Sequence, residues 1–274
     1  MWTVEHRERY KDDGRRYPSD LSDAEWETIV RLLAVYKPLT ADLREMVNSC
    51  LYLHKTGCGW RYLPTDFGPW ETVRSWHDRF KGDGIWADIA ALLVRGVRQA
   101  RGHDPEPSTV LLGSQSVKSG PQEGERGVDG NKKVTGIKRH ILACSLGFVL
   151  AVLVTPANTH DTAPVGQLLA RAAAAGWAPK RVKVDGIYTG ERMDAAVARH
   201  GLAVEVVTKP IDTPGFMPLP LRWRIEATFG THTNRYRRLT RNLEQDAPAS
   251  ENAVEIVNCH RLLKAYSREV RALG

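Results

Sequence analysis

Two carboxylates stand in settings where they could hold a metal ion. Asp185 ends the short apolar segment VKVD and is followed by Gly-Ile-Tyr. Glu226 lies in RWRIEATF, whose pattern predicts the first turns of a helix. Carboxylates brought together from a strand end and a helix can bind Mg²⁺ or Mn²⁺, which prefer oxygen ligands. Two such ions about 4 Å apart stabilise the attacking and leaving oxygens of an in-line phosphoryl displacement.

The same two residues also have an ordinary explanation. A lone aspartate at the end of a strand usually belongs to a turn. A lone glutamate in a helix usually faces solvent or pairs with a nearby arginine. On spacing alone this explanation is the commoner one, so the surrounding sequence has to decide.

Positive charge gathers on the predicted helix of Glu226 and in a second cluster before the predicted hairpin. The chain has 39 Lys and Arg against 32 Asp and Glu, a formal net charge of +7 and a pI of about 9.3. This balance suits a polyanionic partner, because basic side chains that neutralise phosphates release counterions. The alternative is that the arginine-rich segment over residues 222–241 is a solvated helix face that pairs with acidic residues elsewhere. The candidate DNA-binding residues are Lys118, Lys132, Lys133, Lys138, Arg139, Arg224, Arg235, Arg237, Arg238 and Arg241.

The first hundred residues are predicted to be helical. Ser22 and Glu25 have the spacing of a capping box. Helices are predicted from Ser22 and over about residues 41–55, 69–80 and 85–99. The segment RGHDPEP then carries glycine, two prolines and charge, as linkers do. We therefore expect an all-helical domain over residues 1–100, a linker over 101–108 and a second domain over 109–274.

The second domain mixes strands and helices. Strands are predicted over 110–117, 182–185 and 204–208, with a hairpin over 139–157 that turns at Gly147. Helices are predicted from Asp161 or Thr162 to Gly176 and over 192–200, 222–238 and 250–267, with a proline-rich loop over 210–220. This order indicates an α/β layered domain with a mixed sheet and flanking helices. Asp185 would project from the carboxyl edge of that sheet, where sites form in open α/β sheets.

Several classes of protein are disfavoured. The four cysteines form no C-x-x-C pair and no zinc-ligand spacing, so they indicate free thiols in a reducing compartment. The N-terminus has no apolar signal core, and no apolar run reaches the roughly 20 residues that span a bilayer. We expect a cytoplasmic protein without a membrane partner.

Longer segments resemble a known family. LLGSQSVKSG, ERGVDGNKKVTGIKRHILACSLGFVLAVLVTPANTHD, VDGIYTG and LPLRWRIEATFGTHTNRYRRLTRNLE look like bacterial insertion-sequence transposases of the DDE type, in the IS-five group. YPSDLSDAEWETIVRLL, GCGWRYLP and FGPWETVRSWHDRF resemble the helical domain before the catalytic core of that group. The resemblance runs from about residue 16 to 266, with the motifs in order.

The resemblance implies a ribonuclease H-like core and DNA transposition with divalent metal. It makes Asp185 the second acidic ligand and Glu226 the third. Arg222 matches the arginine of the signature around the third carboxylate. The tyrosine and lysine positions of that signature are Leu219 and Thr233 here.

One position departs seriously from the family pattern. Where the family has Asp-Ser-Gln-Ser-Val-Lys, this chain has Gly113 followed by Ser-Gln-Ser-Val-Lys. Asp104 and Glu106 lie outside this strand, toward the linker, and Asp129 belongs to the next segment. The alternative to an impaired site is rescue by another group. A two-metal site without the ligand that bridges both ions should bind Mg²⁺ or Mn²⁺ poorly and stabilise the transition state weakly.

The resulting expectation is a DDE transposase that is impaired at Gly113. Its partners would be double-stranded DNA, as terminal inverted repeats and target, and a second copy of itself. It would be associated with the nucleoid when bound to DNA. The alternative is a non-catalytic DNA-binding protein of transposase descent, a repressor or host factor. The helical domain could hold a helix-turn-helix, with Arg74 and Arg79 among its contacts.

The remaining prominent residues have structural interpretations. His140 and His160 stand at a strand start and a helix cap, where histidines usually make structural hydrogen bonds. The tryptophans of the helical region more often fill a core than stack on bases. These are Trp60, Trp70, Trp76 and Trp86.

Overall fold

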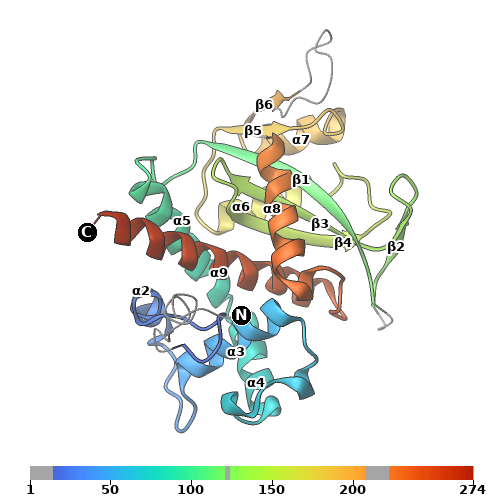
Figure 1. Ribbon diagram of the computed structural model, residues 1–274. Helices are drawn as coiled ribbons and strands as arrows, with labels where there is room; N and C mark the ends of the chain where they lie inside the picture. The colour runs from blue at the N-terminus through green and yellow to red at the C-terminus, as the bar shows by residue number, and fades with distance from the viewer. Residues whose placement is uncertain (1–14, 121–123, 208–221, 274) are drawn as a thin grey trace, which may run out of the picture.

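The computed structural model describes residues 15–120, 124–207 and 222–273 (Figure 1). The first helices lie together at one end of the molecule and the sheet lies at the other, with the long helix α9 between them. The predicted strand end at Thr208 and the proline-rich loop over 210–220 lie outside the described residues. No helix among the described residues is long and apolar enough to cross a membrane.

The predicted N-terminal helices are confirmed. They are α2 (Asp23–Leu33), α3 (Leu43–Thr56), α4 (Trp70–Gly82) and α5 (Ile85–Ala100), with short 3-10 turns η1 (Trp60–Tyr62) and η2 (Thr65–Phe67). The Ser22 hydroxyl accepts the Glu25 amide while the Glu25 carboxylate accepts the Ser22 amide, which completes the capping box. Gly57 ends α3 with φ of 68°, a left-handed conformation that glycine adopts without strain.

A single mixed sheet forms the second half. Its strands are β1 (Thr109–Lys118), β2 (Gly127–Asp129), β3 (Val134–Cys144), β4 (Val149–Pro156), β5 (Arg181–Val184) and β6 (Ala203–Val206). β3 pairs antiparallel with β1 and β4, while β5 lies parallel to both β1 and β6. The order β4-β3-β1-β5-β6, with β3 alone reversed among these five, is that of a ribonuclease H-like sheet and confirms the predicted fold class. The short strand β2, which pairs with the start of β3, was not predicted.

Helices cover both faces of the sheet. Alternation along β1 sends Leu111 to one face and Leu112 to the other. Leu111 packs with residues of α8 (Arg222–Arg235) and α9 (Ala247–Leu273), and Leu112 belongs to the core that includes α6 (Val165–Ala174) and α7 (Glu191–Arg199). That larger core continues into α2–α5 without a break. The division into two domains therefore stays a prediction.

One helix start differs from the prediction. Neither Asp161 nor Thr162 caps α6, which begins at Val165 after Pro164. The Asp161 carboxylate instead lies 3.3 Å from the Lys138 ammonium and accepts a hydrogen bond from Ser114. An aspartate that resembled a helix cap thus belongs to a network with Lys138 and Ser114.

The stability of the fold should depend on pH through buried histidines. Both ring nitrogens of His260 lack a hydrogen-bond partner among the described residues, and burial lowers the pKa of His260 to about 3. An unfolded histidine titrates near pH 6.5. The unfolded state therefore binds more protons between these values, and stability contributed above pH 6.5 is lost as the pH falls.

We expect His260→Leu to stabilise the protein and flatten this pH dependence. An unsatisfied buried polar group costs about 1–3 kcal/mol, so the free energy of unfolding should rise by about that amount. Thermal melts at pH 7 and pH 5 measure it, with the exposed His103→Leu as the control. A melting temperature that falls equally in the parent and in His260→Leu between pH 7 and pH 5 would contradict the assignment of this pH dependence to His260.

Candidate active site

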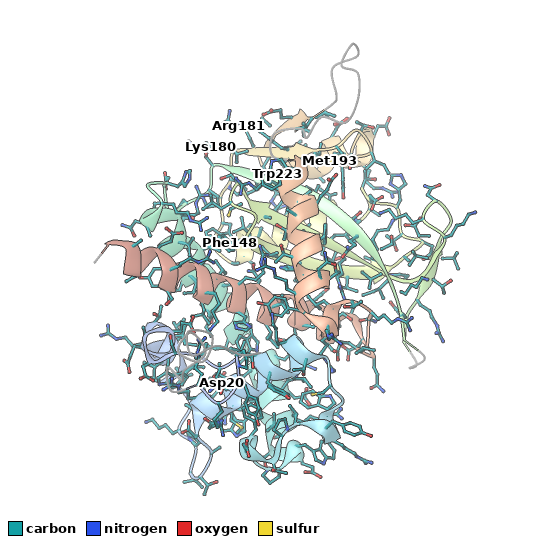
Figure 2. The ribbon with its side chains drawn as sticks, viewed as in Figure 1. Asp20, Phe148, Lys180, Arg181, Met193 and Trp223 are labelled. Carbon is teal, nitrogen blue, oxygen red and sulfur yellow. The ribbon has the colours of Figure 1, made fainter. Side chains whose placement is uncertain are left out.

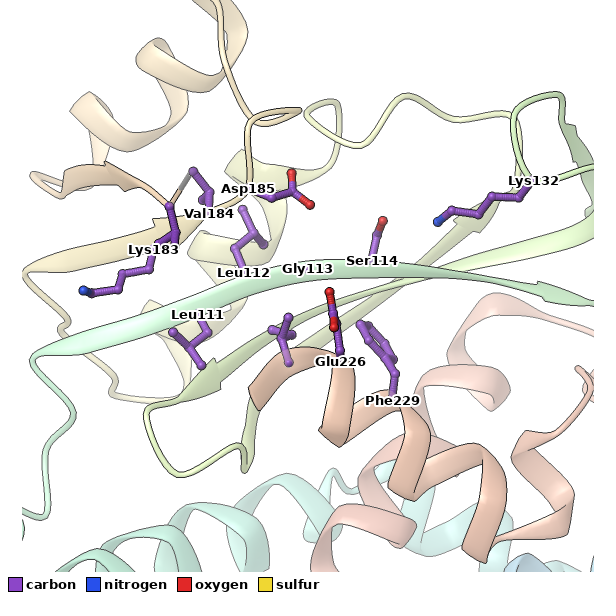
Figure 3. A pocket seen from close by; sticks show the side chains of 12 residues that line it. Leu111, Leu112, Gly113, Ser114, Lys132, Lys183, Val184, Asp185, Glu226 and Phe229 are labelled. Atoms are coloured by element: carbon purple, nitrogen blue, oxygen red, sulfur yellow. The ribbon is translucent and has the colours of Figure 1, made fainter. Parts of the chain in front are cut away.

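A pocket of about 320 Å³ brings together the three positions that the family resemblance aligns with an acidic triad. Gly113 comes from β1, Asp185 follows β5, and Glu226 lies in the second turn of α8. In Figure 3 the Glu226 side chain points from α8 toward β1 at Gly113 and Ser114, and Asp185 lies across the strand. Residues separated by more than a hundred positions in the chain therefore share one site.

Packing against the sheet holds the helix that carries Glu226. Ile225 and Phe229 are buried and belong to the same apolar cluster as Leu111. They dock one face of α8 on β1, so Glu226, next to Ile225, is left exposed at the rim of the pocket. The first turn of α8 lies near the end of β5, and Figure 2 shows Trp223 at that end of the helix.

Asp185 occupies a turn and also lines the pocket. Its Oδ1 accepts the backbone amide of Ile187 at 3.0 Å, as a turn aspartate does. The half-buried carboxylate also lines the pocket with Glu226. The hydrogen bond fixes the orientation of the carboxylate, so the turn and the site are compatible.

At Gly113 the pocket lacks the carboxylate that the family pattern places there. The residue is buried, and a Cβ built on it would lie 3.0 Å from Cγ1 of Ile225. Among the described residues, no group of three histidine, cysteine, aspartate or glutamate side chains could hold a metal ion. Two carboxylates without a bridging third do not fit a pair of divalent ions.

The neighbouring aspartates are engaged elsewhere. Asp129 accepts a hydrogen bond from Ser116 at 2.5 Å, and Asp161 accepts one from Ser114 at 2.5 Å. The buried Lys138 ammonium lies 3.3 Å from Asp161 and 4.0 Å from Asp129 and donates to the Thr159 carbonyl at 2.8 Å. These contacts form a closed network beside the pocket.

Three of the candidate DNA-binding residues are buried, which corrects the expectation that they lie on an exposed basic surface. Lys138 belongs to the network just described. Arg139 is 3% exposed and donates to the Leu239 carbonyl, and burial lowers its pKa to about 10. Arg238 is 6% exposed and pairs with Glu244 at 2.7 Å. β3 and η3 (Arg237–Leu239) turn these three side chains inward, away from the outer surface of the protein.

The other candidates keep surface positions. Arg235, Arg237 and Arg241 are exposed where α8 ends and η3 follows, beside the N-terminal helices. Arg224 lies with its guanidinium 4.6 Å from the centre of the Trp223 ring. Lys118, Lys132 and Lys133 are exposed along β1 and in the turn before β3, and the Arg222 side chain lies outside the described residues.

The histidines and tryptophans match their structural interpretations. The His140 Nε2 lies 3.0 Å from the Thr155 hydroxyl, and the His160 Nδ1 lies 2.9 Å from the Thr162 hydroxyl. Trp86 is 1% exposed, and the other three tryptophans are partly buried against the same core. All four cysteines are free thiols.

Family models match most of the chain in two segments. Residues 21–90 match a model of transposases of the IS4/5 family. Residues 104–259, more than half of the chain, match the transposase DDE domain. This chain belongs to the DDE transposases. The model covers Gly113, Asp185 and Glu226, so the pocket of this transposase lies within the domain that defines the family.

Solved structures of the Mos1 mariner transposase are similar at low identity. Its catalytic domain is 11% identical, covers 68% of this chain and 91% of that chain, and has a TM-score of 0.33. A pre-cleavage Mos1 transpososome is 10% identical, covers 86% and 81%, and has a TM-score of 0.31. The Mos1 mariner paired end complex with Mn is 11% identical, covers 98% and 91%, and has a TM-score of 0.28. No curated protein matches the chain.

Proposed function

We propose that this transposase binds double-stranded DNA at the ends of an insertion element as a homodimer and is strongly impaired in cutting it. The observation that carries the proposal is the pocket that joins Gly113, Asp185 and Glu226 in a member of the DDE family. Asp185 and Glu226 are the candidate catalytic carboxylates and metal ligands. Arg222, four residues before Glu226, is the candidate that steadies the site.

The impairment follows from the charge of the site. Two divalent cations carry four positive charges, and each carboxylate contributes one negative charge to their neutralisation. Removal of the bridging carboxylate weakens the attraction for both ions and the stabilisation of the charge that develops in the transition state. Mg²⁺ and Mn²⁺ are the ions whose oxygen-ligand preference suits the two carboxylates that remain.

The DNA-binding role rests on the exposed arginines where α8 meets the N-terminal helices. Arg235, Arg237 and Arg241 have guanidinium groups that suit phosphate oxygens. In Figure 1 this end of α8 lies beside α3, and α4 lies beyond α3. Arg74 and Arg79 of α4 have half-exposed side chains, so one DNA segment could contact both regions. The helical region would then bind the end of the element, and the DNA strand would run along α8 to the pocket.

Replacement of these three arginines should weaken DNA binding and its salt dependence. We expect the triple variant Arg235→Gln, Arg237→Gln, Arg241→Gln to bind short duplexes less tightly, with the slope of log K against log salt reduced by about 0.9 for each phosphate that the variant no longer neutralises. Fluorescence anisotropy over a salt series measures both quantities. The control is Arg192→Gln with Arg199→Gln, two exposed arginines of α7 at the far end of the sheet. An equal loss per removed charge in the control would show that net charge alone governs binding.

A non-catalytic DNA-binding role is the second candidate, and Gly113 is the observation that favours it. A protein that occupies element ends without cutting them would act as a repressor. Both candidates predict salt-dependent DNA binding, and metal-dependent nicking alone separates them.

A further inference from the structure

The end of α3 and the turn η3 pack directly on each other, and they belong to the two different segments that match family models. Gly57 follows α3 with φ of 68°, and a Cβ built on it would lie 3.0 Å from the carbonyl carbon and the Cβ of Arg237. The Arg238 guanidinium donates to the Cys58 carbonyl at 3.3 Å beside this contact. The left-handed φ and the close backbone approach both favour glycine, so the two elements meet without an intervening side chain.

Two cations at this junction, Lys55 and Arg235, have no carboxylate partner among the described residues. The Lys55 ammonium lies 4.7 Å from the centre of the Tyr236 ring, which follows Arg235 in the chain. Partial burial lowers the pKa of Lys55, and the charges of Arg235 and Lys264 lower it further. Of these neighbours, Lys264 is paired with Glu25 at 2.8 Å. Lys55 and Arg235 therefore carry positive charge that no described acidic side chain neutralises.

This positive charge suits the phosphates of a DNA strand. Two neighbouring cations repel each other, and an anion that contacts both removes the repulsion. Arg235 is exposed and Lys55 is half-buried, so both side chains reach the surface. The exposed Arg237 continues the row of cations along η3. The row is too extended for one small anion and matches successive phosphates of a strand, which basic side chains neutralise in protein–DNA complexes.

We propose that Lys55 and Arg235 bind the same backbone phosphate at the end of the element, so that the helical region and the DDE domain hold one DNA strand together. The proposal rests on the proposed DNA-binding function and deepens it. Lys55 supplies the contact from α3, and Arg235 supplies the contact from α8, the helix that also carries Glu226. Because α3 and η3 are packed without an intervening side chain, the bound phosphate is held at a fixed distance from the pocket.

Neutral methylphosphonate linkages, placed one at a time along a duplex that carries an end of the element, test the shared phosphate. Fluorescence anisotropy gives the Kd of each duplex for the parent, Lys55→Met and Arg235→Gln. One linkage should weaken binding by the parent about tenfold or more, the usual effect of losing a charge-assisted contact. Lys55→Met and Arg235→Gln should each reduce the loss at this same linkage to about threefold, because one cation then remains to sense it.

The matched control is Lys180→Met. Lys180 is exposed, and Figure 2 shows it at the other end of the sheet, so this variant should keep the parent's pattern at every linkage. Methionine also keeps an apolar stem on the Tyr236 ring, so thermal melts should show an unchanged or higher melting temperature for Lys55→Met. Arg235 is exposed, and its variant tests the same linkage even where Lys55→Met lowers stability.

The pattern of losses separates the shared phosphate from DNA binding itself. A reduced loss at one common linkage in Lys55→Met and Arg235→Gln supports the shared phosphate. Different linkages for the two variants, a Lys55→Met pattern identical to the parent's, or a parent that tolerates every linkage overturns it and leaves the proposed DNA-binding function standing. No binding of the unmodified duplex by the parent overturns both.

Discussion

Gly113→Asp is expected to raise the affinity of the pocket for Mn²⁺ by at least about tenfold. At an effective dielectric constant of 20, two unit charges 4 Å apart attract by about 4 kcal/mol, and solvent at the open rim reduces this figure. The new carboxylate would line the pocket together with those of Asp185 and Glu226. Isothermal titration calorimetry with Mn²⁺ measures the change directly.

The packing around Gly113 admits the new side chain with a small adjustment. A Cβ at this position would meet three side-chain atoms of Ile225 at 3.0, 3.3 and 3.4 Å. Because these atoms belong to a side chain and not to backbone, a shift of a few tenths of an ångström relieves the contact. Gly113→Ala adds the same Cβ without the carboxylate, and Gly113→Asn adds an amide of nearly the same shape.

The controls assign the effect to charge. Gly113→Asp should bind Mn²⁺ tightly, while Gly113→Ala and Gly113→Asn stay at the parent level. Glu226→Gln in the Gly113→Asp background should remove most of the gain, because a three-carboxylate site then has two. Equal affinity in the Asp and Asn variants would show that the carboxylate does not reach the ion.

Lys138→Met is expected to destabilise the fold by about 3–5 kcal/mol, the cost of removing one partner from a buried ion pair. The Lys138 side chain is 7% exposed, and it faces the side chains of Asp161, which is 12% exposed, and Asp129, which is 8% exposed. Methionine has nearly the same length and no charge, so both carboxylates would stay buried without their cation. Urea unfolding measures the change.

The pH dependence of this effect identifies its cause. Burial acts to raise the pKa of Asp161, but the hydrogen bond from Ser114 and the charge of Lys138 hold it below its usual value. The hydrogen bond from Ser116 and the Lys132 amide, with Lys138 nearby, likewise lower the pKa of Asp129. A carboxyl with a depressed pKa contributes stability above its unfolded pKa near 3.9 and loses it as the pH falls through the folded value.

Lys138→Met should therefore cost most at pH 7 and less at pH 3.5, where the aspartates of the variant are protonated. The exposed Lys180→Met is the control and should change stability by less than about 0.5 kcal/mol. A cost that stays constant with pH would indicate a packing defect in place of a broken ion pair.

Local patterns were enough to predict most elements of the fold. The capping box at Ser22, the left-handed stop at Gly57 and the turn at Gly147 each follow from local backbone chemistry. The strand β2 was missed because three residues, Gly127–Asp129, are too few to show alternation. The ribonuclease H-like strand order came from the family resemblance, since periodicity does not determine which strands pair.

The candidate site shows the same contrast between what the family resemblance predicted and what local sequence patterns missed. The resemblance placed Gly113, Asp185 and Glu226 in one site, and the structure lines one pocket with all three. Burial of Lys138 and Arg139 was missed because consecutive charged residues look like a surface cluster. β3 lies inside the sheet with helices on both faces, so its successive residues from Gly136 to Cys144 are all buried. Tertiary position decided this outcome, and local charge did not.

The most direct test of the account is a cleavage assay with Mg²⁺ and Mn²⁺ on DNA that carries the ends of the element, comparing this chain with Gly113→Asp. The account predicts metal-dependent cleavage by Gly113→Asp and little or none by the parent, with equal DNA binding by both. Equal cleavage by the two proteins would contradict it, because the first acidic ligand would then lie elsewhere. No cleavage by either protein, with DNA binding retained, would favour the non-catalytic role.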